Sequence, residues 1–396
     1  MNISEIKKLD EEYIASTYGR LPLVPAYGKN ATLTDVCGRK YIDFTAGIGV
    51  NSLGIAPEEW IAAVTEQLGK IQHISNYYYS APTAVLAEKI VKSSQMKKVI
   101  FSNSGGEANE AAIKTARKYS FDKYGKGRSK IITLLDSFHG RTVTTLSATG
   151  QDVFHNYFFP FTEGFDYVKA GDIEALEKLC DGTVCAVMCE VIQGEGGVNV
   201  IDAGFLSEVK KLCDEKDILL IFDEVQTGIA RTGTLYAYQN VGVKPDIFTL
   251  AKGLGAGLPI GCCVLGEKCA DVLHPGDHGS TFGGNPVICA GACVVMDTVT
   301  KPEFLNSVKE KGNYIISEIS LMNAPVVSEI RGRGLMIGVK VKASHKEIAK
   351  KCLDEGLMIL TAGKDVLRFL PPLTITYGEI DKGLEILRKV LSEIPG

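Results

Sequence analysis

The chain has 396 residues, of which 45% are hydrophobic and 23% charged, and its formal net charge is −4. This length suffices for one large domain and a smaller one, and the weakly acidic balance gives no indication of nucleic acid or an anionic membrane as partner. No apolar run approaches the roughly 20 residues that span a bilayer, and the charged first twelve residues are unlike a signal or transit peptide. We therefore expect a cytoplasmic protein without a membrane or nucleic-acid partner.

Eleven cysteines are present, an odd number, and several lie in apolar, strand-like runs. Buried cysteine behaves as a small hydrophobic residue. No Cys-x-x-Cys pair occurs, and no Cys/His spacing suits zinc. We therefore expect reduced, structural thiols and no metal site, in agreement with a reducing compartment.

The N-terminal part predicts a β-hairpin followed by a helix. Residues 35–44 have the pattern of a hairpin with its turn at Cys37-Gly38. A helix is expected from about Pro57, since proline suits the first helical turn. We expect residues 1–50 to join a small domain that both termini build.

Between about residues 98 and 265, apolar runs alternate with helical patterns. The strand candidates are residues 98–101, 130–135, 185–192, 218–225, 246–251 and 260–265. One helical face consists of Ala108, Ala111, Ala112, Thr115, Ala116 and Tyr119. Strands that alternate with helices predict βαβ units and a mostly parallel sheet. We therefore expect an α/β fold with residues 51–284 as the large domain.

The pattern changes after residue 284. A long helix is expected from about Pro286, and a last helix begins at Thr376 with a capping-box spacing to Glu379. Strands are expected at 334–341 and 366–370, with a helix at about 345–355 between them. Residues 285–396 are therefore predicted to form an α+β C-terminal small domain.

An acid and an amine end two of the apolar runs in the large domain. Asp223 and Lys252 are both expected at the carboxyl edge of one sheet, where open α/β sheets bind ligands. A carboxylate there can pair with a protonated ring nitrogen, and a lysine of lowered pKa can bind a carbonyl cofactor as a Schiff base. Val225 is placed to pack on a ring, and Gln226 to donate to a phenolic oxygen. The alternative is a structural salt bridge between Asp223 and Lys252.

Two turns rich in glycine and hydroxyl groups can bind anions. Ser102–Glu110 follows a strand and opens a helix, so its backbone N–H groups can surround a phosphate. The alternative is a glycine turn with a serine helix cap. Gly279–Pro286, which contains Ser280 and Thr281, is a second anion-binding candidate.

Three further segments carry candidate ligand contacts. Phe138 and His139 could lay a flat face on a planar cofactor, and Arg141 could bind a carboxylate with two parallel hydrogen bonds. The loop Glu190–Gly197 puts two carboxylates at the end of a strand, and Arg368 lies in an apolar strand where an arginine needs a partner. The alternatives are a core phenylalanine, a surface histidine and solvated charges.

Together these groups describe one cofactor and one class of substrate. They comprise two phosphate-type loops, an imine-forming lysine, an acid for a pyridinium nitrogen, a flat platform and two carboxylate-binding arginines. This set fits pyridoxal phosphate and an amino-acid substrate. In such enzymes the cofactor is the electron sink, and the protein orients and tunes it.

The chain resembles class III aminotransferases of fold type I over nearly its whole length, and among them the members that act on acetylornithine. The segments that carry the resemblance are residues 41–51, 73–76, 103–110, 138–142, 193–197, 223–228, 251–255 and 280–286. The resemblance implies a large domain with a mostly parallel sheet flanked by helices, and a smaller α+β domain. It also implies two-step, ping-pong transamination between a small-molecule amino acid and a 2-oxo acid.

The resemblance implies a role for each matching residue. Lys252 carries pyridoxal 5'-phosphate as a Schiff base and moves the proton, while Asp223 pairs with the pyridine nitrogen. The other expected cofactor contacts are Gly105, Gly106, Phe138, Glu224, Val225 and Gln226, with Thr281 contributed by the second subunit of a homodimer. The expected substrate contacts are Arg141, Ser280, Arg368 and Glu195. Glu195 and Arg368 resemble a switch: they pair while the ω-amine reacts, and they part when Arg368 receives the α-carboxylate of 2-oxoglutarate or glutamate.

The sequence departs from the family pattern at two positions, and it leaves alternatives open. Gly106 supplies no hydroxyl, so we expect one phosphate hydrogen bond fewer, with Ser104 or a water compensating. Val191 replaces a common proline and should change only loop stiffness. The amine donor stays open between acetylornithine and ornithine, succinylornithine, succinyldiaminopimelate or 4-aminobutyrate. A non-catalytic pyridoxal-phosphate-binding protein is the alternative from another class, although such a protein would be expected to lose Lys252 or Asp223.

Overall fold

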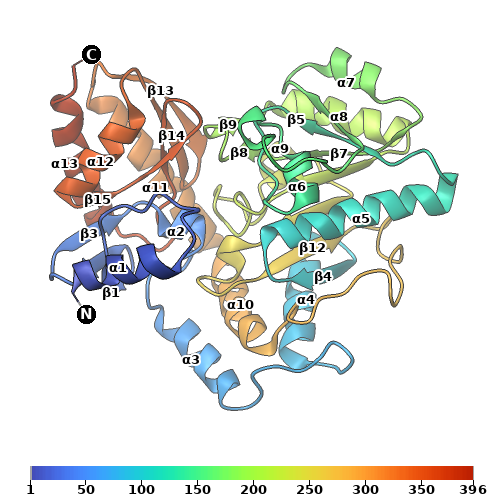
Figure 1. The fold of residues 1–396 in the computed structure, drawn as a ribbon, viewed down its shortest axis with the longest axis horizontal. Coiled ribbons are helices and arrows are strands. Elements are labelled where there is room, and N and C mark those ends of the chain that lie inside the picture. Colours follow the sequence, from blue (N-terminus) through green and yellow to red (C-terminus); the bar gives the residue numbers. More distant parts are fainter. Residues whose placement is uncertain (1, 396) are drawn as a thin grey trace.

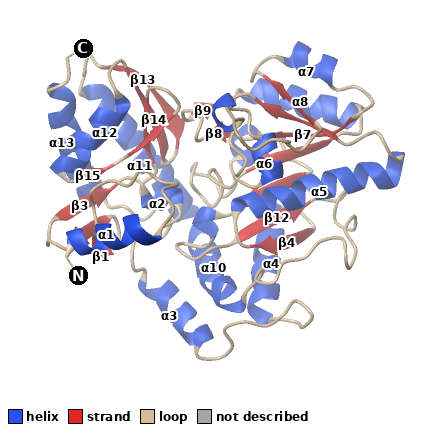
Figure 2. Cartoon of the chain, in the orientation of Figure 1, coloured by secondary structure: helices blue, strands red, loops and turns tan. Residues whose placement is uncertain are grey.

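The computed structural model describes residues 2–395. Its largest β-sheet has seven strands (Figures 1 and 2). The strands, in spatial order, are β4 (Lys98–Ser102), β12 (Gly261–Leu265), β11 (Ile247–Leu250), β10 (Leu219–Asp223), β7 (Val184–Cys189), β5 (Lys130–Leu134) and β6 (Phe165–Val168). All neighbouring pairs from β11 to β6 are parallel, whereas β12 runs antiparallel to β11 and β4. The expected α/β class with a mostly parallel sheet is confirmed.

Helices cover both faces of this sheet. Consecutive strand residues alternate between two apolar clusters, so that Ile131 packs with the alanine face of α5 (Gly105–Tyr124), whereas Ile132 packs with α8 (Ala203–Glu215). Strands buried on both faces are continuous apolar runs. This arrangement explains why the central strands of the sheet were visible in the sequence.

The remaining helices surround this core and the smaller sheets. They are α1 (Ile3–Tyr13), α2 (Ala46–Gly49), α3 (Glu58–Leu68), α4 (Ala81–Ser94), α6 (Val143–Ala148), α7 (Ile173–Leu179), α9 (Tyr238–Val241), α10 (Pro286–Val299), α11 (Pro302–Leu321), α12 (His345–Glu355) and α13 (Tyr377–Ser392). Two 3-10 turns are η1 (Asp152–Phe154) and η2 (Lys252–Leu254). Helix α10 packs against α3 and α4, below the large sheet in Figure 1.

The smaller sheets bring the two ends of the chain together. One has the order β1 (Pro25–Lys29), β2 (Thr32–Asp35), β3 (Lys40–Asp43) and β15 (Leu357–Met358), and another the order β13 (Val327–Arg333), β14 (Met336–Val341), β17 (Val366–Phe369) and β16 (Leu360–Ala362). A short ribbon joins β8 (Ile192–Gln193) to β9 (Asn199–Val200). Because β3 pairs in parallel with β15, N-terminal and C-terminal segments share one sheet (Figure 1). The domain boundaries at residues 50 and 284 stay a prediction.

The structure differs from the expected elements in three places. The strand expected at 185–192 ends at Cys189, where the chain turns into the short strand β8. The edge strand β6 was not predicted, since Asp166 and Tyr167 interrupt its apolar pattern. Pro57 is the residue that precedes α3, with ψ of 124°, and does not lie in its first turn.

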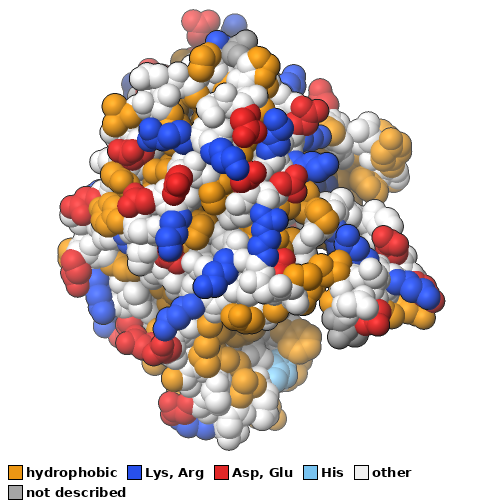
Figure 3. Space-filling view, turned by 90° about the vertical axis from the view of Figure 1, so that its left-hand side faces the viewer, with side chains coloured by type: hydrophobic (Ala, Val, Ile, Leu, Met, Phe, Trp, Pro, Cys, Tyr) orange, Lys and Arg blue, Asp and Glu red, His pale blue; other side chains and the backbone are white. Residues whose placement is uncertain are grey.

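Within residues 2–395, every helix is too short or too polar to cross a bilayer. Figure 3 shows the face built by the two ends of the chain, where Lys and Arg side chains are interspersed with Asp and Glu. No single sign of charge dominates this face, which agrees with the small net charge of the sequence.

Candidate active site

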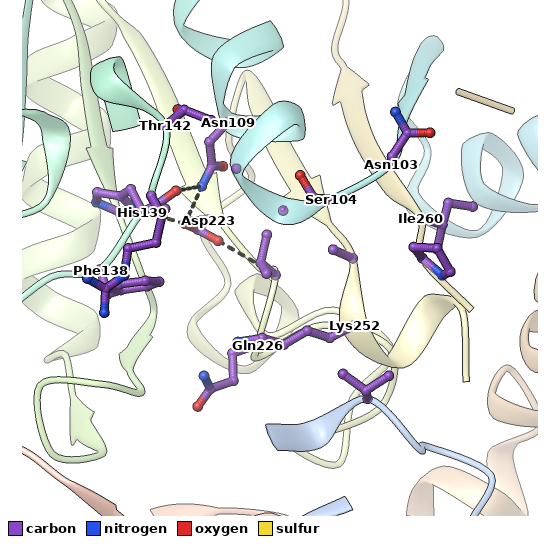
Figure 4. A pocket seen from close by; sticks show the side chains of 18 of the residues that line it. Asn103, Ser104, Asn109, Phe138, His139, Thr142, Asp223, Gln226, Lys252 and Ile260 are labelled. Carbon is purple, nitrogen blue, oxygen red and sulfur yellow. Dashed lines mark hydrogen bonds and ion pairs between the residues drawn. The ribbon is translucent and has the colours of Figure 1, made fainter. Parts of the chain in front are cut away.

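A cavity of about 700 Å³ opens at the carboxyl edge of the large sheet (Figure 4). Its lining includes most of the residues that the sequence singled out: Gly105, Gly106, Phe138, His139, Arg141, Glu195, Asp223, Val225, Gln226 and Lys252. Asp223 ends β10, and Lys252 follows β11, which pairs in parallel with β10. Parallel strands direct their carboxyl ends to one edge, so the fold brings together side chains that are far apart in sequence.

The Asp223 carboxylate is buried and held by three donors. Its Oδ2 accepts from Asn109 Nδ2 at 2.7 Å and from His139 Nδ1 at 2.8 Å, and its Oδ1 accepts from the Val225 amide at 3.0 Å. Thr249 in turn donates to Asn109 Oδ1 at 2.7 Å. Figure 4 shows this group on one side of the cavity. Such a network fixes the carboxylate in one orientation.

Lys252 is a separate group, and among the described residues no ion pair joins it to Asp223. Its backbone adopts a left-handed φ of 42°, which is strained for a residue other than glycine. Strained backbone conformations of this kind cluster at functional sites. Burial lowers the pKa of the Lys252 amine, against the opposing effect of the Glu195 carboxylate. A lysine of lowered pKa has a larger share of the neutral, nucleophilic amine.

The N-terminus of α5 forms one wall of the cavity. Ser104 caps the helix by accepting from the Glu107 amide at 3.2 Å, and Gly105 and Gly106 form the first helical positions. A Cβ added at Gly105 would lie 2.6 Å from Val225 Cγ1, whereas one at Gly106 would meet nothing closer than 3.7 Å. The close approach at Gly105 requires glycine and leaves helix N–H groups free for an anion.

Aromatic rings and an arginine form another wall. The Phe138 and Phe154 rings meet edge to face with centroids 5.8 Å apart. The Arg141 guanidinium lies over both, 4.2 Å from the Phe154 centroid and 5.4 Å from that of Phe138. Arg141 is exposed at the cavity, so its donors stay available to a carboxylate while cation–π contacts hold its position.

Arg368 and Glu195 form a bidentate ion pair although 173 residues separate them. Nη1 and Nη2 of Arg368 donate to the two oxygens of Glu195 at 2.7 and 3.1 Å. Gln226 joins the pair, since its Oε1 accepts from Arg368 at 3.1 Å. Burial raises the pKa of Glu195, but the charge and hydrogen bonds of Arg368 lower it more, so the carboxylate is held ionised.

Two buried glutamates near the site behave differently. Glu224, expected to contact the cofactor, lies outside the cavity lining, and its carboxylate accepts from the Ala237 and Tyr238 amides at 2.6 and 2.7 Å.

Glu190 lines the cavity and had no role assigned from the sequence. It accepts from the Phe138 and Gly194 amides at 3.1 and 3.3 Å. Burial and the nearby Asp223 charge raise the pKa of Glu190 well above its usual range. Its only sequence signal was its place at a strand end.

Ser280 and Thr281 lie outside this cavity, on the loop before α10. Ser280 Oγ accepts from Asn103 Nδ2 at 3.1 Å, and Asn103 itself lines the cavity. Thr281 is exposed. The structure therefore brings Ser280 near the edge of the site, whereas Thr281 is exposed and does not line the cavity.

Fold and site define the class of protein as an α/β transferase with a lysine, an acid and an anion cradle around one cavity. The aminotransferase class-III family model matches residues 13–391, and the chain belongs to this family. A relative named acetylornithine aminotransferase from Haemophilus ducreyi is 51% identical over 100% of both chains, and a relative of the same name from Synechocystis is 43% identical over 99% of this chain and 94% of its own. The resemblance found in the sequence is thereby confirmed.

Solved structures agree with this assignment. An ornithine aminotransferase from Toxoplasma gondii, described with partial occupancy of PLP at its active site, has a TM-score of 0.93 at 33% identity and covers 98% of this chain and 94% of its own. An acetylornithine aminotransferase from Elizabethkingia anophelis has a TM-score of 0.89 at 31% identity, with complete coverage of both chains. Family and neighbours imply pyridoxal phosphate as the cofactor.

Proposed function

We propose that this protein transfers an amino group between N2-acetyl-L-ornithine and 2-oxoglutarate, with N-acetyl-L-glutamate 5-semialdehyde and L-glutamate as products, a reaction of arginine biosynthesis. The shared name of the curated relatives over the full chain length supports this substrate. The structural observation that carries the proposal is the Glu195–Arg368 pair in the same cavity as Lys252. An arginine that can exchange its carboxylate partner suits an enzyme that alternates between two unlike substrates.

The residues present fit pyridoxal phosphate. The cavity supplies an anion cradle at Gly105, a buried carboxylate at Asp223 for a protonated ring nitrogen, and an amine of lowered pKa at Lys252 for covalent attachment. When bound, the cofactor supplies an electron sink for the carbon that carries the amine. We assign Lys252 to hold the cofactor and Gly105, Gly106, Phe138 and Val225 to hold its phosphate and ring.

Residues of the chain itself perform the remaining steps. Lys252 would hold the cofactor until the substrate amine takes its place, and the freed Lys252 nitrogen would then accept the proton of the amine-bearing carbon, because a neutral amine can act as a base. Asp223 keeps the ring nitrogen protonated by its charge. Arg141 binds the α-carboxylate of acetylornithine, and Ser280 supports it from the neighbouring loop.

The Glu195–Arg368 pair would select between substrates. While paired, the two charges cancel and leave room for an uncharged or amine-bearing chain. When a dicarboxylate enters, Arg368 exchanges Glu195 for the incoming carboxylate, to which a planar guanidinium binds equally well. The partly exposed Glu195, at 29% of its side chain, has the freedom to move, whereas Arg368 is 3% exposed and stays.

We also propose a homodimer in a cytoplasmic location. The exposed Thr281 supports a contact made across a subunit interface, since it does not line the cavity of its own chain. Three consecutive exposed tyrosines, Tyr77, Tyr78 and Tyr79, support an interface nearby, because contiguous exposed aromatics mark association surfaces. The free cysteines support a reducing compartment.

The test is a comparison of amine donors at saturating 2-oxoglutarate. Purified holoenzyme should form glutamate fastest, by kcat/KM, from acetylornithine. A higher kcat/KM for free ornithine would contradict the proposed substrate, and the ornithine aminotransferase of Toxoplasma gondii makes ornithine the first alternative. Cofactor bound at Lys252 without glutamate from any donor would favour a non-catalytic binding protein.

A further inference from the structure

Arg231 is a buried arginine outside the cavity lining and has a side-chain exposure near zero. Its Nη1 donates to the carbonyls of Leu335 at 3.0 Å and Pro371 at 2.5 Å, and its Nη2 has no partner among the described residues. Burial lowers the pKa of Arg231 to about 9, and the Asp43 charge opposes this. Burial of a cation whose hydrogen bonds go to neutral carbonyls is costly, and the Asp43 carboxylate offsets only part of this cost.

The segment that carries Arg231 touches the turn of the reactive lysine. Residues 227–233 follow the strand that ends in Asp223, and a Cβ added at Gly253, next to Lys252, would lie 3.5 Å from Ile229 Cβ. Ile229 has a left-handed φ of 55°, which is strained for a β-branched residue. The surrounding packing therefore forces this segment into one conformation.

On its other side the same segment holds the strands around Arg368. Leu335 directly precedes β14, whose Gly338 pairs with Arg368 on β17, and the Leu335 amide donates to the Arg231 carbonyl at 3.0 Å. Pro371 follows β17 by two residues. A Cβ at Gly334 would lie 2.7 Å from the Arg231 carbonyl oxygen, so the two backbones are in direct contact. Arg231 thus connects the lysine turn with both strands that position Arg368.

We propose that Arg231 is a positioning residue that sets the place of the Arg368 guanidinium relative to Lys252 and so determines the affinity for the dicarboxylate substrate. This inference rests on the proposed function, in which Arg368 receives the carboxylate of 2-oxoglutarate. The amine half-reaction depends on it less, because there Arg368 is paired with Glu195, a partly exposed side chain that can follow a small displacement.

The test replaces Arg231 with lysine, which keeps a basic side chain but reaches fewer carbonyls. We expect the KM for 2-oxoglutarate to rise roughly tenfold, as for a substrate contact displaced by a fraction of an ångström, while the KM for acetylornithine changes less than about threefold. Binding of glutarate, measured by calorimetry, should weaken by the same factor as the KM for 2-oxoglutarate. The calorimetric readout does not depend on turnover.

Arg128→Lys is the matched control. Arg128 likewise donates to backbone carbonyls, those of Val184, Lys216 and Asp217, at 2.7 to 2.9 Å, but it lies at the amino ends of β5, β7 and β10, opposite the edge that carries the cavity. Arg128→Lys should lower the Tm without changing either KM. If Arg231→Lys does not fold, the same two KM values and glutarate binding are measured for Gly334→Ala, which pushes the backbone of residue 334 away from that of Arg231.

Equal increases in both KM values, or a fall in Tm with unchanged glutarate binding, would overturn the proposal and leave Arg231 with a purely structural role. Failure of the proposed function has a different signature: wild-type protein would then aminate 2-oxoglutarate from another donor or from none. If the donor is another amine, the effect of Arg231→Lys on glutarate binding still decides the inference about Arg231.

Discussion

At the scale of single residues, the strongest feature of the site is the restraint on Asp223. Two side chains, Asn109 and His139, donate to one of its oxygens, and Thr249 fixes Asn109 in turn. Hydrogen bonds to a charged group contribute about 1.5–3 kcal/mol each. The restraint therefore suffices to keep the carboxylate aimed at one point of the cavity.

Replacing Asn109 by alanine should lower kcat by about tenfold or more, because Asp223 would keep only His139 as a side-chain donor. Steady-state assays with acetylornithine and 2-oxoglutarate measure the change. Asn306→Ala removes an exposed asparagine that bonds only to Glu310 and should leave kcat unchanged. An unchanged kcat in Asn109→Ala would show that His139 alone holds the acid.

Replacing Glu195 by glutamine should change the balance of the two half-reactions. Without the negative charge, Arg368 is unpaired while the ω-amine reacts, so kcat/KM for acetylornithine should fall about tenfold relative to kcat/KM for glutamate. The pKa of Glu195 is lowered from 4.5, so in wild type the pair is lost only as pH falls below that value. Glu66→Gln, in an exposed pair with Lys70, is the control. Equal losses in both half-reactions would contradict the switch.

Residue identities in the site were largely predictable, because most stood in a motif at the end of a strand, and Arg368 was a charged residue within an apolar one. The direction in which each side chain points was not predictable from the sequence. Glu224 lies beside Asp223 in sequence, but its carboxylate accepts from two amides at the start of α9. Asn109 and Arg231 gave no signal, since an asparagine in an alanine-rich helix and an arginine near glycines are both typical of exposed positions.

At the scale of elements, the two glycines at the start of α5 differ in the space around them. Gly105→Ala places a methyl group in contact with Val225, so the affinity for pyridoxal phosphate should fall roughly tenfold or more. Gly106→Ala meets only ordinary contacts and should retain the cofactor. Equilibrium titration of the apoprotein with cofactor measures both. Equal affinities in the two variants would contradict the assignment of Gly105 to the phosphate cradle.

The turn between β10 and α9 should carry a pH-dependent stability. Burial raises the pKa of Glu224 to about 7 against the two backbone donors, whereas the unfolded chain titrates near 4.5. The folded state thus binds the proton more tightly, so stability relative to Glu224→Gln is highest below pH 4.5 and is lost as pH rises from 4.5 through 7, by at most about 3.4 kcal/mol. A Tm difference between wild type and Glu224→Gln that is independent of pH would contradict this.

Element types followed from the sequence better than their directions did. The runs that became β7 and β10 are apolar on both faces, which predicts buried parallel strands. The run that became β12 looks the same but lies antiparallel between β11 and β4, because strand direction depends on how the chain returns to the sheet. No local pattern records that path.

At the scale of the whole molecule, the site exists because segments far apart in sequence meet. Lys252 and Asp223 come from the large sheet, and Arg368 comes from a sheet built near the C-terminus. Arg231 links the segment after β10 to the residues next to β14 and β17. The proposed switch between two substrates would therefore be a property of the assembled fold and not of any one motif.

The central claim is that one cavity performs two separate half-reactions, and single-turnover mixing tests it most directly. Cofactor-loaded protein mixed with acetylornithine alone should form one semialdehyde per active site. The aminated protein, freed of that product, should then convert 2-oxoglutarate alone to one glutamate. Lys252→Ala should form neither at a comparable rate. Product that appears only when both substrates are present, or no product from acetylornithine, would contradict the account.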